Sequence, residues 1–591
     1  MSGNRTSGGR RTVRALLALA LATLLGGCVS VPSTGPVIRG DQSSTRPTSQ
    51  VEIAAQPPAA NSSPRAVVDG FLQAMAAYEP DYATARLYLA PSVRDAWQPT
   101  SGVTVYADGH AVTESDGKVT LSAPVTGRVD ARGAFTPVKD QLTTDFGLQR
   151  GADGQWRISA PPQGLLVSQF VFDNFFQHPS LYWPEPGGQY LVPDPVSLAQ
   201  GRRTPSTLVR ALLAGPGDWI APAVSSAIPA GTSLRSDVAV DSAGVATVDL
   251  TGPIDTLDTA QRRLLAGQLT WTLAQLPTVT GVKVLHDGAT YALGDLAGQN
   301  SVVPVKALPS LAPVPAALDS HLFAIVDRKV VRVDQSDQTS TVVPIPGPFG
   351  QGGTVPESLA VTAAADTAAV VTGGGTRVTT IDLSAGTTSA TFTGLSRLLR
   401  PQYARTGELW LVSGEPGRQR IQIAQGDQLH DIDAGELAGE RISSFRLSPD
   451  GARMALVIER DGHTALALAR VDRHGGTLRV EGLQVIPLVT SGQSQLTSVS
   501  DVGWAGPMGL VVLGAGQEST QPSPYRLDLS TVAVQQIGQP DGWQARSIAT
   551  LPNPESTRMV IVGDQGGAWR YEDAFTWPHL SSTMTAAAYP G

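Results

Sequence analysis

The chain has 591 residues, 41% of them apolar, and a formal net charge of −8 at pH 7. This length predicts several domains rather than one, and the acidic balance disfavours nucleic acid or an anionic bilayer as a direct binding partner. The 62 glycines and 44 prolines are dispersed along the chain, which excludes collagen and is typical of many short strands joined by turns.

Residues 1–27 are predicted to form a signal peptide. Four arginines and no acidic residue lie within the first 14 positions, and residues 15–25 are apolar except for Thr23. As a helix, these eleven residues would rise only about 16 Å, roughly half the thickness of the hydrocarbon core of a bilayer. The segment is therefore too short to be a permanent membrane span.

Cys28 is the only cysteine of the chain and directly follows the apolar run. Together with Leu25, Gly26 and Gly27 it resembles the bacterial lipobox, which implies cleavage before Cys28 and acylation of its thiol, with palmitate as the expected fatty acid. The alternative is a chance thiol in an ordinary secretory signal. A single free thiol is a liability outside the cell, so lipidation and a membrane anchor are favoured.

Two regions follow the lipobox: a polar stalk and then a folded domain. From 28 to 63 the chain is mostly proline, serine, threonine and glutamine, so a disordered stalk is predicted behind the lipidated cysteine. Ser63 and Pro64 then supply an N-cap and a first-turn proline for an amphipathic helix. Short strand-like runs follow, and they predict an α+β domain over residues 64–165. This pattern resembles the NTF2-like fold.

Residues 166–297 are predicted to form a small α/β domain. A helix follows Thr204, a hairpin covers 234–250, Asp258 caps a second helix, and a buried strand covers 282–285. Four segments resemble the GerMN domain of sporulation and germination proteins: Ala211-Leu-Leu-Ala-Gly-Pro, Ile228-Pro-Ala-Gly-Thr, Thr247-Val-Asp-Leu and Gln275-Leu-Pro-Thr-Val. The resemblance implies a binding module without chemistry of its own.

A linker is predicted at 298–317, an all-β propeller at 318–580 and a C-terminal tail at 581–591. Apolar strand cores recur at spacings of 41 to 55 residues, which is typical of propeller blades and predicts about six of them. These cores lie around Ile325, Val370, Leu411, Leu456, Val511 and Ile561.

The clearest copy of the repeat runs from Phe445 to Val457. Its segment Ser448-Pro-Asp-Gly451 predicts a tight turn between two strands, because the proline presets φ at the second turn position and the glycine closes the turn. This copy resembles the repeat of TolB-type and WD40-like propellers. The other copies are degenerate.

No motif in the sequence predicts catalysis, a cofactor or a metal. The eight histidines are dispersed and form no zinc-binding helix motif, and one cysteine cannot make a thiolate cluster. The segment from Asp431 to Glu436 is similar to a calcium-binding loop but lacks its third ligand position and its distal glutamate, so an ordinary loop is predicted. Propellers can assemble an active site from several blades, which keeps an enzyme open as an alternative.

The order of lipobox, polar stalk, NTF2-like module, GerMN-like module and degenerate propeller resembles the actinobacterial LpqB lipoprotein family. The resemblance implies a non-enzymatic lipoprotein on the extracytoplasmic face of the cell membrane. As its partner it implies the extracytoplasmic domain of a sensor histidine kinase of the MtrB type. The implied role is to modulate this two-component system and thereby cell-envelope homeostasis and division. Only Cys28 carries over as a functional residue.

Two other functions remain open on the sequence. The propeller could bind or modify envelope glycan. Clustered acidic and aromatic side chains at the propeller channel would favour this function. The chain could also be a purely structural linker of the envelope, in which case no signalling change should depend on it.

Overall fold

The computed structural model describes residues 55–591 except 78, 202–203, 297, 316–318, 336–339, 461, 491–493, 517–518, 520, 539–543 and 554–557. The lipobox residues Leu25, Gly26, Gly27 and Cys28 lie outside the described residues. The described residues form one compact unit. None of the described helices is long and apolar enough to cross a membrane.

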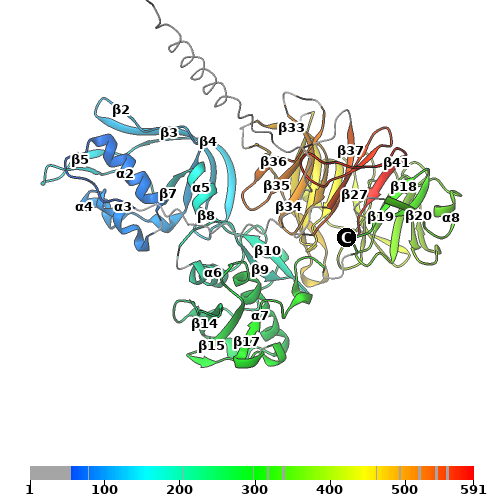
Figure 1. Cartoon of the computed structure of the whole chain (residues 1–591), viewed down its shortest axis with the longest axis horizontal. Coiled ribbons are helices and arrows are strands. Elements are labelled where there is room, and N and C mark those ends of the chain that lie inside the picture. The colour runs from blue at the N-terminus through cyan, green and yellow to red at the C-terminus, as the bar shows by residue number, and fades with distance from the viewer. Residues whose placement is uncertain are drawn as a thin grey trace, which may run out of the picture. The chain divides into compact units, whose positions relative to one another are not determined.

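The N-terminal domain packs helices on one antiparallel-rich sheet, as predicted (Figure 1). Its helices are α2 (Pro64–Ala76), α3 (Ala83–Leu87), α4 (Pro91–Arg94) and α5 (Gln169–Phe175). Its main sheet has the order β2-β3-β1-β7, with β4 also paired to β3. The strands are β1 (Val103–Tyr106), β2 (Thr113–Ser115), β3 (Lys118–Val129), β4 (Phe135–Asp145), β5 (Leu148–Arg150), β6 (Trp156–Ile158) and β7 (Leu165–Ser168). Ser63 caps α2 by accepting from the Ala66 amide.

The GerMN-like domain, called the GerMN domain below, builds its core between helices α6 and α7 and a mixed sheet of order β12-β14-β15-β16. Its helices are α6 (Thr204–Leu213) and α7 (Thr259–Leu273), and Asp258 caps α7 in a capping box with Gln261. The strands and short pairs of this region are β8 (Phe176–Gln177), β9 (Ser180–Pro184), β10 (Leu191–Pro195), β11 (Leu198–Ala199), β12 (Ser233–Leu234), β13 (Ala239–Val240), β14 (Val245–Thr251), β15 (Gly281–His286), β16 (Ala289–Thr290) and β17 (Val302–Pro304).

The described C-terminal residues form six four-stranded sheets and one short helix, α8 (Pro348–Gln351). The first three sheets contain β18 (Leu322–Val326), β19 (Lys329–Gln335), β20 (Ser340–Pro344), β21 (Ser358–Val361), β22 (Thr367–Thr372), β23 (Arg377–Asp382), β24 (Thr388–Phe392), β25 (Gln402–Tyr403), β26 (Leu409–Ser413), β27 (Arg420–Gln425) and β28 (Gln428–Asp431). The first sheet also contains β41 (Met584–Ala588). The other three contain β29 (Arg441–Leu447), β30 (Arg453–Arg460), β31 (His463–Asp472), β32 (Arg479–Val485), β33 (Leu496–Trp504), β34 (Gly509–Gly516), β35 (Ser523–Asp528), β36 (Ala533–Gln536), β37 (Ala545–Leu551), β38 (Arg558–Gly563), β39 (Ala568–Arg570) and β40 (His579–Ser581).

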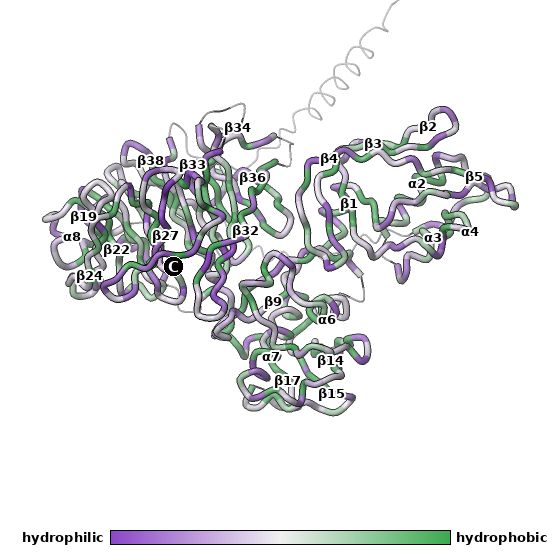
Figure 2. Tube along the Cα trace, turned by 180° about the vertical axis from the view of Figure 1, so that it is seen from behind, coloured by the Kyte–Doolittle hydropathy of each residue, from purple (hydrophilic) through white to green (hydrophobic). Residues whose placement is uncertain are grey.

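The six apolar cores singled out in the sequence all fall on equivalent strands. Each lies in the second strand from the inner edge of its sheet, namely β18, β22, β26, β30, β34 and β38. These strands are buried on both faces between neighbouring sheets, which makes them continuously apolar. Hydrophobic stretches run through the propeller strands, while many connecting loops are hydrophilic (Figure 2).

Three predicted boundaries are wrong. The tail at 581–591 contains β41, which pairs with β18 and closes the ring of sheets with the end of the chain (Figure 1). The linker at 298–317 contains β17, which pairs with β15 and extends the GerMN sheet. The N-terminal domain continues past 165, because β7 pairs with β1 and Phe172 of α5 is buried in its core.

Candidate functional site

A pocket opens at the end of the propeller toward which the innermost strands run. Each of these six strands contributes a lining residue at or next to its last position: Val361, Tyr403, Leu447, Trp504, Thr550 and Ala588. Further residues of these strands, the loops that leave them and Arg400 and Pro401 just before β25 complete the lining, together with Pro315 from the segment before the propeller. All six sheets of the propeller therefore contribute at least one residue to the lining of this pocket.

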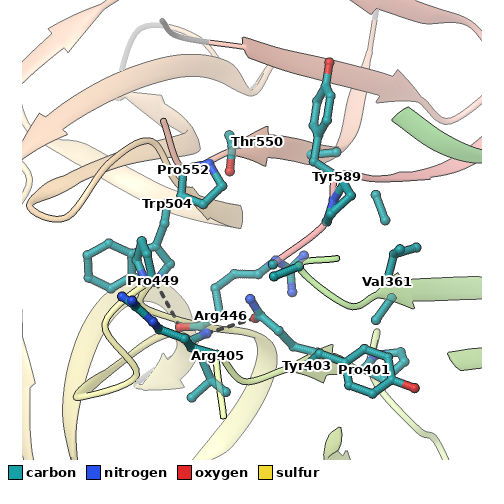
Figure 3. A pocket seen from close by; sticks show the side chains of 18 of the residues that line it. Val361, Pro401, Tyr403, Arg405, Arg446, Pro449, Trp504, Thr550, Pro552 and Tyr589 are labelled. Carbon is teal, nitrogen blue, oxygen red and sulfur yellow. Dashed lines mark hydrogen bonds between the residues drawn. The ribbon is translucent and has the colours of Figure 1, made fainter. Parts of the chain in front are cut away.

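The walls of the pocket are apolar and aromatic. Figure 3 shows Trp504, Pro449 and Pro552 on one side and Val361 and Tyr403 on the other. The indole nitrogen of Trp504 donates to the Arg446 carbonyl oxygen at 3.1 Å, which fixes the ring against the wall. No aspartate or glutamate occurs among the described lining residues. Rigid aromatic and proline faces with few polar groups are typical of small-molecule sites.

Arg446 carries a buried positive charge at the pocket, and its partner is Asp501. The guanidinium lies 3.1 Å from an Asp501 carboxylate oxygen, and both side chains are less than 10% exposed. Asp501 also accepts from the Ser444 hydroxyl at 2.6 Å and the Ile548 amide at 2.9 Å. Burial lowers the pKa of Arg446 and the charge of Asp501 opposes this shift. The pair is thus neutral overall and ties three inner strands together.

Arg400 also lines the pocket, but it forms no ion pair with a carboxylate of the described residues. Its two terminal nitrogens donate to the carbonyl oxygens of Ile548 at 2.9 Å and Ala587 at 3.3 Å. Among the described residues no carboxylate lies within ion-pair distance of Arg400. Its hydrogen bonds are satisfied in part by the backbone, but its charge is not neutralised by any side chain of the described chain.

Arg405 lies at the edge of the pocket, where the GerMN domain and the segment before the propeller approach. Its guanidinium lies 4.2 Å from the ring centre of Tyr190, in the loop between β9 and β10, and donates to the Ala312 carbonyl oxygen at 2.7 Å. Burial lowers the pKa of Arg405 and raises that of Tyr190. Arg405 also has no carboxylate within ion-pair distance among the described residues.

The predicted turn at Ser448-Pro-Asp-Gly451 is confirmed and also contributes to a domain contact. The Gly451 amide donates to the Ser448 carbonyl at 2.8 Å, and Gly451 has a positive φ of 67°. Asp450 lies 3.4 Å from Arg453, with side-chain exposures of 0% and 3%. Arg453 in turn donates to the carbonyl of Pro193 in the GerMN domain. The turn thus positions a buried ion pair at the face on which the GerMN domain packs.

Trp219 of the GerMN domain is held between two propeller strands. Its indole nitrogen donates to the Gly482 carbonyl at 2.7 Å, and its own carbonyl accepts from Arg470 at 2.6 Å. A Cβ atom on Gly482 would lie 3.0 Å from both the indole nitrogen and the guanidinium. Glycine at 482 is therefore needed for this close approach.

The sequence did not predict the arginines of the pocket. Arg400, Arg405 and Arg446 lie 5 to 46 residues apart in the chain and no motif joins them. Aromatic side chains line the pocket, as a glycan site would require, but no aspartate or glutamate occurs among the described lining residues. Among the described residues no group of three or more His, Cys, Asp or Glu side chains could hold a metal ion.

Comparison with known proteins matches all three domains. Residues 57–173 match the family described as "Lipoprotein LpqB, N-terminal domain", 180–292 "Sporulation and spore germination", and 329–590 "Lipoprotein LpqB beta-propeller domain". Among the relatives, "Lipoprotein LpqB" of Cutibacterium acnes is 30% identical over 98% of this chain and 99% of its own length. The chain belongs to the LpqB lipoprotein family.

Other family members are similar over the same span. "Lipoprotein LpqB" of Streptomyces avermitilis is 31% identical over 96% of this chain and 97% of its own length, and that of Streptomyces coelicolor is 29% identical over all of both chains. A solved nidogen/laminin complex covers 46% of this chain and 98% of its own, with a TM-score of 0.34 and 11% identity, a likeness too low to carry an argument.

Proposed function

We propose that this protein is a lipid-anchored, extracytoplasmic accessory protein of a two-component sensor kinase. The observation that carries the proposal is the match to relatives named lipoproteins over almost the whole chain. The lipobox at residues 25–28 supports the anchor, and the MtrB-type kinase as partner rests on the family resemblance. In this proposal the protein acts by binding, not catalysis, and affects envelope homeostasis and division.

A lipid anchor makes such a contact effective even if it is weak. Two acyl chains hold a protein on a bilayer stably, because each buried methylene contributes about 0.8 kcal/mol. Tethering confines protein and kinase to one surface, which raises their effective concentration. Binding then shifts the equilibrium between the active and inactive states of the kinase. The size of this shift is the difference between the binding free energies of this protein for the two states, typically about 1 to 3 kcal/mol.

The test compares phosphorylation of the cognate response regulator in cells with wild-type protein, without the protein, and with Cys28→Ala, at equal kinase levels. Loss of the protein should change phosphorylation, and Cys28→Ala should leave the protein unprocessed or released and should restore signalling poorly. Unchanged phosphorylation would contradict the kinase role. Membrane retention of a processed Cys28→Ala protein would contradict the lipid anchor, and glycan turnover by the purified full chain would favour an enzyme.

A further inference from the structure

We propose that the pocket at the end of the propeller channel binds a small ligand that carries a carboxylate or phosphate group together with an apolar part. This site is independent of the kinase role proposed above. It is formed by the last residues of the innermost strands and by Arg400, Arg405 and Arg446.

The first argument is the local charge. Three guanidinium groups line the pocket, and the carboxylate in ion-pair contact with them among the described residues is that of Asp501, which neutralises Arg446. Gly591, the last residue of this sequence, also lines the pocket but makes no ion pair with the three arginines. Near Arg405, Asp450 is engaged by Arg453 and Glu185 accepts from the amides of its own turn. Partly buried cations without a counterion are unfavourable, so the pocket attracts an anion.

The second argument is the presence of donors that nothing accepts. The Nε of Arg446 and the hydroxyl of Tyr403 are both buried and have no hydrogen-bond partner. Tyr403 is only 5% exposed, and its ring packs into the apolar core between two sheets with the hydroxyl pointing away from the cavity (Figure 3). Buried polar groups are nearly always paired in folded proteins. An acidic ligand oxygen is an acceptor that the described chain does not supply to the Nε of Arg446.

The third argument limits the kind of ligand. Trp504, Pro449 and Pro552 form rigid apolar walls, which favour a ligand with an aromatic or aliphatic part next to its acidic group (Figure 3). Pro315 lines the pocket and Ala312 contacts Arg405, so the segment before the propeller borders the site. A concave site bordered in this way suits a small molecule better than a folded protein surface.

The test uses ligand-observed NMR titrations of the full chain in detergent. Phenylacetate and phenyl phosphate serve as anionic probes, and neutral phenylacetamide is the matched control for the same apolar ring. Wild type should bind at least one anion and bind the amide much more weakly. Comparison of the two anions tells whether a carboxylate or a phosphate is preferred, and either preference supports the proposal.

Two variants locate the binding to the pocket. Arg400→Gln removes one cation and should weaken anion binding on the order of tenfold to a hundredfold, since charge-assisted hydrogen bonds are lost. Arg420→Gln, an exposed arginine of β27 paired with Asp431, is the matched control and should bind as wild type does. If Arg400→Gln does not fold, Thr550→Glu places a carboxylate in the pocket and should abolish anion binding.

Three results would overturn the proposal. The first is that the amide binds as tightly as the anions. The second is that neither anion binds at concentrations on the order of 10 mM, which a fragment of this size should not require in a formed site. The third is that folded Arg400→Gln or Thr550→Glu protein binds the anions as tightly as wild type.

Discussion

Two pairs of arginines at the same end of the propeller differ in what surrounds them. Arg453 and Arg470, the docking arginines, each donate to a backbone carbonyl of the GerMN domain and each lie within 3.4 Å of a carboxylate oxygen, from Asp450 and Glu481. Arg400 and Arg405, the pocket arginines, also donate to backbone carbonyls, but no carboxylate of the described chain is within ion-pair distance.

The presence or absence of a carboxylate partner indicates two different roles for arginine at this end of the propeller. Where the GerMN domain covers the propeller, a carboxylate accompanies each docking arginine, because a desolvated charge without a partner is costly. The pocket arginines lack that partner, although Arg405 also packs on Tyr190 of the GerMN domain. We infer that the docking arginines hold the domains together and that the pocket arginines are available to a ligand.

The largest expected effect is that of Arg453→Met. This change leaves Asp450 buried without its cation and removes the hydrogen bond to Pro193. It should lower the free energy of unfolding by about 3–5 kcal/mol, as measured by chemical denaturation of the full chain.

Arg420→Met is the control for this prediction. Arg420 pairs with Asp431 on the surface, and both side chains are more than half exposed. An exposed pair contributes only about 0–1 kcal/mol. Equal losses in the two variants would show that the buried pair has no special role at the domain contact.

A smaller loss is expected for Trp219→Ala. This side chain packs against the cores of both the GerMN domain and the propeller and donates to Gly482. Because it is half-buried, its removal should cost about 2–3 kcal/mol, below the range for a fully buried tryptophan. Limited proteolysis should then cut between the domains sooner than in wild type. An unchanged cleavage rate would contradict a contact that holds the domains together.

The smallest effect concerns pH. Histidine is the side chain whose ordinary pKa lies between about pH 5 and 7. Burial lowers the pKa of His178 below its ordinary 6.5, with Asp528 and Asp173 opposing the shift. The unfolded chain therefore binds this proton more readily than the folded one, so stability present above pH 6.5 is lost as the pH falls toward the folded-state pKa.

His178→Gln should remove this part of the acid sensitivity, because glutamine stays neutral and can still hydrogen-bond to Ser197. The measurement is the melting temperature between about pH 7 and 5. If the variant loses as much stability as wild type over this range, His178 is not the group that titrates.

The sequence was most informative where one physical constraint acts on a run of neighbouring residues. The second strand from the inner edge of each sheet is buried on both faces, so it is a continuous run of apolar residues. The regular spacing of these runs predicted the propeller repeat. The turn at 448–451 and the cap at Asp258 were predicted because their geometry depends on residues a few positions apart.

Features that depend on distant parts of the chain were missed. β41 is a short, alanine-rich strand that carries little apolar signal, and its pairing with β18 joins segments more than 250 residues apart. The pocket arginines likewise come from separate positions, and their lack of a carboxylate is visible only in the folded chain. The lipobox at Cys28 lies outside the described residues and stays a prediction.

The most direct test of the two roles is the thermal shift caused by phenyl phosphate in three full chains: wild type, Arg453→Met and Arg400→Gln. A ligand of the folded state raises the melting temperature in proportion to its binding. The account predicts that Arg453→Met melts lower than wild type but keeps the shift, whereas Arg400→Gln loses it. A shift that survives in Arg400→Gln and disappears in Arg453→Met would contradict the account.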